Sequence, residues 1–165
     1  MSESVIVSAP GEGRTLLVGG GDRVTYKVRS AETDGAYFCF EVSTTPGFGP
    51  TLHKHSYSEL FHVLEGTYEF TVERDGRMET ITGAAGTTVA VPPGVPHTFK
   101  NASSAPARLL FFHQPAALEP FFEEFGVPVG EDGEIPDGTE PPDFGAMAAA
   151  LQRNGVDVIR YEAMH

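Results

Sequence analysis

Two histidines separated by a single residue, His53 and His55, constrain the fold of this chain more than any other feature. Side chains two positions apart project from the same face of a β-strand, whereas on a helix they point about 200° apart. Two such imidazoles can share one metal ion, at about 2.1 Å each, only if the backbone there is extended. Glu59 follows four residues later, and His97 opens another short strand after a Pro-Gly turn. Three imidazoles and one carboxylate at this spacing predict a metal site held by β-strands.

The chain up to about residue 114 alternates short apolar runs with Gly and Pro at close intervals. This pattern is typical of an all-β sandwich or barrel. Asp75-Gly76 is the strongest two-residue hairpin signal, and Glu65-Gly66 offers another tight turn because glycine tolerates a positive φ. The predicted strands span residues 15–19, 24–29, 36–43, 51–55, 59–65, 67–73, 78–81, 88–91, 97–101 and 107–113.

The pattern changes after Pro115. Apolar residues recur at helical spacing from Leu118 to Phe125, and Gly126 is the stop, which together predict a short helix. Residues 127–142 are acidic and rich in Pro and Gly, so we expect an irregular connection there.

A second helix is predicted from Asp143, a candidate N-cap, to about Arg153, and residues 156–161 are expected to return as an edge strand. A chain of 165 residues fits one domain. Within it, residues 1–115 are expected to form the barrel and residues 116–165 a short helical extension packed on it.

Charge and composition exclude several classes of partner. The net charge of −12 argues against binding to the phosphates of nucleic acids. No apolar run approaches the ~20 residues of a membrane-spanning helix. The segment Met1-Ser2-Glu3-Ser4 lacks the positive charge that opens a secretion signal. We therefore expect a cytoplasmic protein with a small-molecule substrate and no nucleic-acid or membrane partner.

Two segments resemble the signature motifs of the cupin superfamily, and every signature position is filled in both. The motifs are Gly47-x5-His53-x-His55-x3-Glu59-x6-Gly66 and Gly86-x5-Pro92-x-Gly94-x2-His97-x3-Asn101. The 19 residues between them suit the variable loop of that family. The resemblance implies a double-stranded β-helix, the jelly-roll type of barrel, with a metal inside near one mouth.

The residues after Pro115 are similar to single-domain cupins of the quercetin 2,3-dioxygenase-like group. This resemblance implies a metal-dependent dioxygenase acting on a small enolisable or phenolic ring compound, with Glu59 accepting the substrate proton. Two alternatives use the same residues. One is a metal Lewis acid that catalyses isomerisation, cyclisation or lyase chemistry without O₂, and the other is a small-molecule-binding cupin without catalysis.

The predicted metal ligands are His53, His55, Glu59 and His97. Neutral imidazoles with one carboxylate suit Fe(II), Mn(II), Ni(II), Co(II), Cu(II) or Zn(II), so the set predicts one divalent transition metal and leaves its identity open. Two or so positions stay open on a six-coordinate ion for a substrate or O₂. Glu59 is the one ligand that can also take a proton, which is the basis of its predicted catalytic role.

Because side chains alternate between the two faces of a strand, residues an even number of positions from a ligand should lie on the same face as that ligand. Phe61 and Val63 share parity with Glu59, and Phe99 shares it with His97, so these side chains should face the barrel interior. They either fill the core, as in other small barrels, or wall an apolar pocket for a ring-containing substrate. The candidate pocket residues are Phe40, Phe61, Val63, Phe99 and His113, and for His113 a position behind the ligands and a surface position both remain open.

His62 has the opposite parity to Glu59 and is expected to point outward. With Leu60 and Leu64 it would give this strand an apolar outer face. Because cupins commonly pair barrel to barrel, the resemblance implies a homodimer. Tyr57, between the ligands, is interpreted as a solvated turn residue rather than a lid.

Overall fold

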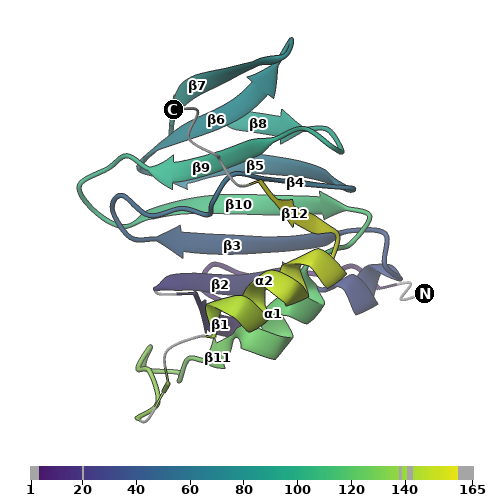
Figure 1. Cartoon of the computed structure of the whole chain (residues 1–165). Coiled ribbons are helices and arrows are strands. Elements are labelled where there is room, and N and C mark those ends of the chain that lie inside the picture. Colours follow the sequence, from purple (N-terminus) through teal and green to yellow (C-terminus); the bar gives the residue numbers. More distant parts are fainter. Residues whose placement is uncertain (1–3, 20, 138, 141–142, 160–165) are drawn as a thin grey trace.

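The computed structural model describes residues 4–19, 21–137, 139–140 and 143–159. The described residues up to 114 form ten strands (Figure 1). These strands are β1 (Thr15–Val18), β2 (Asp22–Val28), β3 (Phe38–Thr44), β4 (His53–His55), β5 (Ser58–Glu65), β6 (Thr67–Arg74), β7 (Arg77–Ala84), β8 (Thr88–Val91), β9 (His97–Asn101) and β10 (Ala107–Gln114). A 3₁₀ turn, η1 (Ser30–Thr33), joins β2 to β3.

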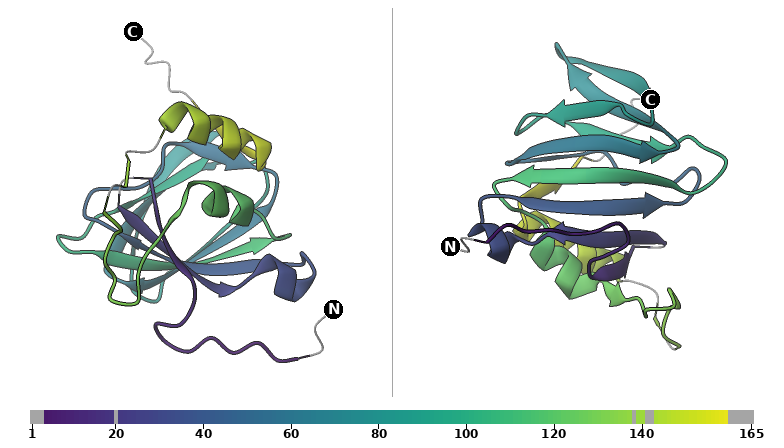
Figure 2. Two further views of the ribbon diagram at one scale, coloured as in Figure 1. Left: turned by 90° about the horizontal axis from the view of Figure 1, so that it is seen from below. Right: turned by 180° about the vertical axis from the view of Figure 1, so that it is seen from behind.

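Two antiparallel sheets enclose a common interior. One has the strand order β11-β1-β2-β3-β10-β5-β8, and the other has the order β12-β4-β9-β6-β7. Buried and less buried residues alternate along β3, β5 and β10, so one face of each strand faces the core. Viewed from below, the strands surround this core, with α1 across the open end and α2 along one side (Figure 2). The predicted all-β, double-stranded β-helix is confirmed.

Tight turns hold the strands in register where the sequence predicted them. Asp75 and Gly76 both have positive φ, 51° and 73°, as a two-residue hairpin that follows the strand twist requires. Gly66 also has a positive φ of 82°, and a Cβ there would lie 2.6 Å from the Ala107 side chain. Glycine is therefore required at this turn for both its conformation and its size.

The C-terminal residues that the structure describes form two helices and two short strands. Helix α1 (Glu119–Phe125) and helix α2 (Phe144–Arg153) match the predicted helices, and the Asp143 side chain caps α2. Strand β11 (Val127–Pro128) pairs with β1, and β12 (Val156–Val158) pairs with β4. The segment after residue 115 is thus more than a helical extension, because it adds one strand to each sheet. The predicted strand over 156–161 extends past β12, and residues 160–161 lie outside the described part of the chain.

Helix α1 is fixed to the barrel through a buried carboxylate. Glu119 accepts hydrogen bonds from the Ser30 backbone N–H at 2.8 Å, from the Ser30 hydroxyl, and from Arg29 Nε at 2.7 Å. These contacts hold the apolar side of α1 over the open end of the barrel. Among the described residues, no helix has both the length and the apolar character needed to span a membrane.

Candidate metal centre

Three strands bring the predicted ligands together. His53 and His55 lie on β4, Glu59 lies on β5 of the other sheet, and His97 lies on β9 opposite His53. Their ligand atoms all lie within 4.8 Å of one another. Three of them are almost fully buried, since His55, Glu59 and His97 are 3%, 6% and 1% exposed.

The hydrogen bonds of the imidazoles fix which nitrogen faces the centre of the cluster. Nδ1 of His53 lies 2.7 Å from the Thr51 carbonyl oxygen, Nδ1 of His55 lies 2.9 Å from that of Tyr57, and Nδ1 of His97 lies 2.8 Å from that of Val95. A carbonyl oxygen only accepts, so each Nδ1 carries a proton and donates it. Every neutral ring of the three therefore presents the lone pair of Nε2, which is the form that binds a metal.

These lone pairs converge on an anion, and this is where a cation fits. Nε2 of His55 and Nε2 of His97 both lie 2.8 Å from Glu59 Oε2. Two acceptors at that distance repel unless a positive charge lies on or between them. Adjacent ligands of an octahedral metal, with bonds of about 2.1 Å at right angles, lie about 3.0 Å apart. The donor set and its spacing thus fit a divalent metal bound by three Nε2 atoms and Oε2.

His113 holds the other oxygen of Glu59. Its Nε2 lies 2.8 Å from Glu59 Oε1, and its Nδ1 donates to the Ala117 carbonyl at 3.0 Å. Because Nδ1–H is committed to that carbonyl, His113 donates to Glu59 only when both ring nitrogens carry protons. The ring is fully buried and orients the carboxylate so that Oε2 faces the cluster.

The electrostatics suit ligands rather than solvent-exposed polar groups. Burial lowers the pKa of His53 to about 4, with the nearby His97 acting in the same direction, so His53 is neutral at pH 7. Burial alone would raise the pKa of Glu59, but His113, His55 and His97, when a proton on Nε2 lets them donate to the carboxylate, lower it well below its usual value. The site therefore combines one neutral, available imidazole with a carboxylate that stays ionised.

Tyr57 is a buried member of the site and not a solvated turn residue. Its ring stacks on that of His55, with centroids 3.9 Å apart and planes 2° apart, and its side chain lines the adjacent pocket. Burial raises the pKa of its phenol, and the charge of Glu59 adds to this. Its neighbours Ser56 and Ser58 are exposed, so strand-like alternation was the available signal that Tyr57 faces inward.

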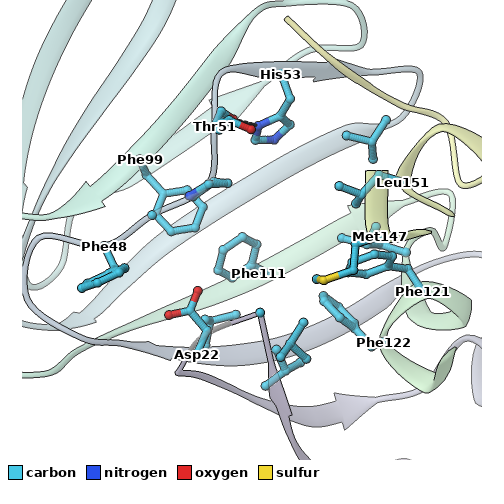
Figure 3. Close-up of a pocket in the computed structure, with 18 of the residues that line it drawn as sticks. Asp22, Phe48, Thr51, His53, Phe99, Phe111, Phe121, Phe122, Met147 and Leu151 are labelled. Carbon is cyan, nitrogen blue, oxygen red and sulfur yellow. Dashed lines mark hydrogen bonds between the residues drawn. The ribbon is translucent and has the colours of Figure 1, made fainter. Parts of the chain in front are cut away.

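An apolar pocket of about 540 Å³ opens beside the ligand cluster (Figure 3). His53, Tyr57 and Glu59 lie in its wall, so the cluster is reached from the pocket. The remaining wall comes from β1–β3, the loop before β4, strands β9, β10 and β12, and the two C-terminal helices. The main apolar side chains are Val18, Val24, Phe40, Val42, Phe48, Phe99, Phe111, Leu118, Phe121, Phe122, Met147, Leu151, Val156 and Val158.

The structure distributes the candidate pocket residues over three environments. Phe40 and Phe99 line the pocket. Phe61 and Val63, each 1% exposed, lie in the closed core, where Phe61 packs against Phe70, Phe99 and Phe111. His113 lies behind Glu59, as described above. Parity placed Phe61, Val63 and Phe99 inside the barrel, but it does not show which part of the interior is hollow.

His62 faces outward as expected. It is partly exposed, and its Nδ1 lies 2.7 Å from the Thr88 hydroxyl on the neighbouring strand β8. It takes no part in the ligand cluster.

Comparisons with known proteins agree with this fold. Residues 40–113 match the family described as the cupin domain. None of the curated proteins compared matches the sequence. An RmlC-like cupin from Shewanella frigidimarina is 23% identical with a TM-score of 0.56, over 73% of this chain and 99% of that one.

Two enzymes share the fold. The polyketide cyclase RemF from Streptomyces resistomycificus is 19% identical with a TM-score of 0.55, over 69% of this chain and 80% of that one. Oxalate decarboxylase from Bacillus subtilis is 22% identical with a TM-score of 0.54, over 70% of this chain and 30% of that longer one. At these identities the likeness shows a cupin fold, and the quercetin dioxygenase-like subgroup stays a prediction.

Proposed function

We propose that this cupin domain is a metal-dependent oxygenase acting on a largely apolar ring compound that carries an enolisable or phenolic hydroxyl. One observation carries the proposal: three imidazole lone pairs and one carboxylate converge at the wall of an apolar pocket large enough for such a compound. Pockets of about 300–1,000 Å³ hold ligands of drug-like size. A small, highly charged substrate would leave these apolar walls in contact with water.

The residues of the chain divide the chemistry between them. A divalent metal bound by His53, His55, Glu59 and His97 would acidify a hydroxyl or enol that coordinates it. Glu59 is the one carboxylate among these ligands and can accept that proton if it comes within hydrogen-bonding reach of the hydroxyl. Tyr57 stays protonated, because its pKa is raised, and can donate a hydrogen bond to the bound compound. The deprotonated ring compound is the electron-rich species that reacts with O₂.

A second candidate is cyclisation or isomerisation without O₂. It is favoured by the presence of a proton acceptor, Glu59, and a proton donor, Tyr57, in the wall of one pocket. Both groups would act directly on the substrate as general base and general acid. The shared fold of the polyketide cyclase RemF is compatible with this candidate.

Elemental analysis tests the ligand set. We expect about one equivalent of a divalent metal in the wild type and in His62→Ala, a matched control that removes an outward-facing histidine of the same barrel. His97→Ala should contain none and should retain its β-structure by circular dichroism. Full metal content in His97→Ala would show that the ligand set is wrong.

Measuring turnover under air and under argon distinguishes the oxygenase from cyclisation or isomerisation without O₂. The protein, loaded with Fe(II), Mn(II), Ni(II), Co(II), Cu(II) or Zn(II) in turn, is incubated with hydroxy-ketones, enols and catechol-type phenols. Products that form only under air, with O₂ consumed, support the oxygenase. Products that also form under argon support the second candidate, and binding without conversion indicates a ligand-binding protein.

A further inference from the structure

The pocket has a polar group at each of two distant ends. The metal-ligand end is marked by His53, and the carboxyl of Asp22 faces the interior from the opposite end (Figure 3). The ring of Phe111 lies between these two ends, and Phe99 lies across from Met147 (Figure 3). A compound that fills this space would contact the metal at one end and Asp22 at the other.

The strand pattern places Asp22 at that end. It is the first residue of β2 and shares an inward parity with the buried Val24 and Tyr26. Arg23 pairs with Ser43 in the register of β2 and β3, so one step further sets Asp22 opposite Thr44. The ligand end lies at the level of Phe38, the cross-strand partner of His113. Phe38 and Thr44, which mark the two ends, are six residues apart on β3, about 20 Å along the strand at ~3.3 Å per residue.

The Asp22 carboxyl has no hydrogen bond or ion pair to any residue that the structure describes. The adjacent Arg23, which points outward, does have a partner, since it donates to the Gly133 carbonyl at 3.1 Å. Burial raises the pKa of Asp22 to about 6, as expected for a carboxyl partly removed from water without a compensating donor. An unpaired carboxyl in an apolar wall costs stability, and a ligand that donates to it removes that cost.

Two further hydroxyls lie near this end. Within the described residues, Thr44 Oγ1 and Tyr68 Oη are buried without a hydrogen bond of normal geometry. The two hydroxyls face each other, and burial raises the pKa of Tyr68 to about 12, with its contact to the Thr44 hydroxyl opposing the change and the charge of Asp22 adding to it. Neither hydroxyl lines the pocket, so Asp22 is the charged side chain in the pocket wall at this end.

We propose that Asp22 is a substrate-recognition residue that binds a hydroxyl, amine or ammonium group at the end of the substrate remote from the metal. The inference rests on the function proposed above and narrows its substrate class. The substrate is an elongated, largely apolar ring compound, neutral or cationic, with a chelating oxygen pair at one end and a hydrogen-bond donor at the other. No Lys or Arg is found among the described residues that line the pocket, so an anionic tail would lack a partner.

A matched series of probes tests this inference on zinc-loaded protein, because zinc supports binding without redox chemistry. The parent probe is 3-hydroxyflavone, which carries a hydroxy-ketone chelator at one end and a phenyl ring at the other. Its 4′-hydroxy, 4′-aminomethyl and 4′-methoxy derivatives change only the remote group. Dissociation constants are measured by fluorescence titration for the wild type, Asp22→Asn and Asp22→Leu. The control is Glu41→Gln, which removes an outward-facing carboxylate of β3 that pairs with Arg108.

In the wild type, the hydroxy and aminomethyl probes should bind at least about 10-fold more tightly than the methoxy probe, as expected for charge-assisted hydrogen bonds. Asp22→Asn should abolish the aminomethyl advantage and reduce the hydroxy advantage. Asp22→Leu should abolish both, and Glu41→Gln should change neither. An unchanged order of affinities in Asp22→Leu, or no advantage or no binding in the wild type, overturns the inference.

The parent probe separates this inference from the proposed function. If it binds only when zinc is present and the remote groups make no difference, the metal site stands and the role of Asp22 is wrong. If zinc has no effect on any probe but the aminomethyl advantage depends on Asp22, the recognition residue stands and the proposed metal-dependent function fails.

Discussion

At the scale of single residues, the site depends on how each imidazole is oriented by its own backbone surroundings. Three Nδ1–H groups are committed to the carbonyls of Thr51, Tyr57 and Val95, so the ligand nitrogens are presented before any metal arrives. Such preorganisation reduces the entropy lost on metal binding. His113 extends the same arrangement by holding Glu59 Oε1.

His113→Phe should therefore weaken metal binding by about 10–100-fold, the usual effect of removing a group that orients a metal ligand. The substitution keeps a ring of similar size but leaves Glu59 Oε1 buried without a donor. Competition with a chromophoric chelator measures the affinity, and His62→Phe is the matched control because His62 contacts Thr88 outside the site. Equal affinities in wild type and His113→Phe would contradict the orienting role.

Glu59→Gln separates the two predicted roles of Glu59. An amide oxygen still coordinates weakly, so some metal should be retained, but turnover should fall by ~10²-fold or more, the usual contribution of a positioned base. Rates are compared at matched metal occupancy on any substrate found by the screen, with His62→Gln as the control. A wild-type rate in Glu59→Gln would show that Glu59 is only a ligand.

Ionisation of the Asp22 carboxyl should lower the free energy of unfolding as the pH rises. A carboxyl whose pKa is about 6 in the folded chain and 3.8 when fully exposed to water binds its proton more tightly in the folded chain. The free energy of unfolding therefore falls between about pH 4 and pH 6, and the full cost is present above that range. Asp22→Asn should be more stable than wild type by about 1–3 kcal/mol at pH 8 and equally stable at pH 4. Urea unfolding at both pH values measures this, and a difference independent of pH would contradict it.

At the scale of elements, the sequence predicted the strands, turns and helix ends that depend on short local patterns. Alternating apolar residues predicted β3, β5 and β10. The Asp75-Gly76 dipeptide predicted the turn between β6 and β7, and Asp143 as an N-cap predicted the start of α2. Strand β11 was not foreseen because two residues carry no periodicity. The sequence predicted an apolar pocket as one of two alternatives but missed most of its wall, because β1, β2, α1 and α2 are brought together only by the tertiary fold. The ligand cluster was predictable because its spacing is itself a strand pattern.

Helix α2 closes one side of the pocket, so its stability should affect binding. The Asp143 side chain accepts a hydrogen bond from the Ala146 backbone N–H at 3.0 Å, while Met147 and Leu151 line the pocket. Asp143→Ala removes the cap, at a cost of about 1 kcal/mol. Faster amide exchange confined to α2 and weaker binding of the hydroxyflavone probes should follow. Gln152→Ala, an exposed change on the same helix, should alter neither, and unchanged exchange in Asp143→Ala would contradict the prediction.

At the scale of the whole molecule, the outer face of the seven-stranded sheet carries an apolar patch formed by Tyr37, Cys39, Leu60, Leu110 and Phe112. Phe112 is the cross-strand partner of both Cys39 and Leu60, and the Tyr37 ring stacks on it with centroids 5.2 Å apart. All five residues are partly exposed in the single chain. Contiguous apolar surface of this kind commonly marks an interaction site.

We expect this apolar patch to be the interface of a homodimer in which the same surface of both copies meets. Light scattering at micromolar concentration should give about twice the 17.7 kDa of one chain. Phe112→Lys places a charge in the middle of the patch and should shift the mass to the monomer, because burying two unpaired charges at an interface is costly. Thr82→Lys is the matched control, since it adds the same charge at an exposed position on β7, opposite Glu69. A wild-type monomer, or a Phe112→Lys protein that stays dimeric, would show that this face does not join two copies.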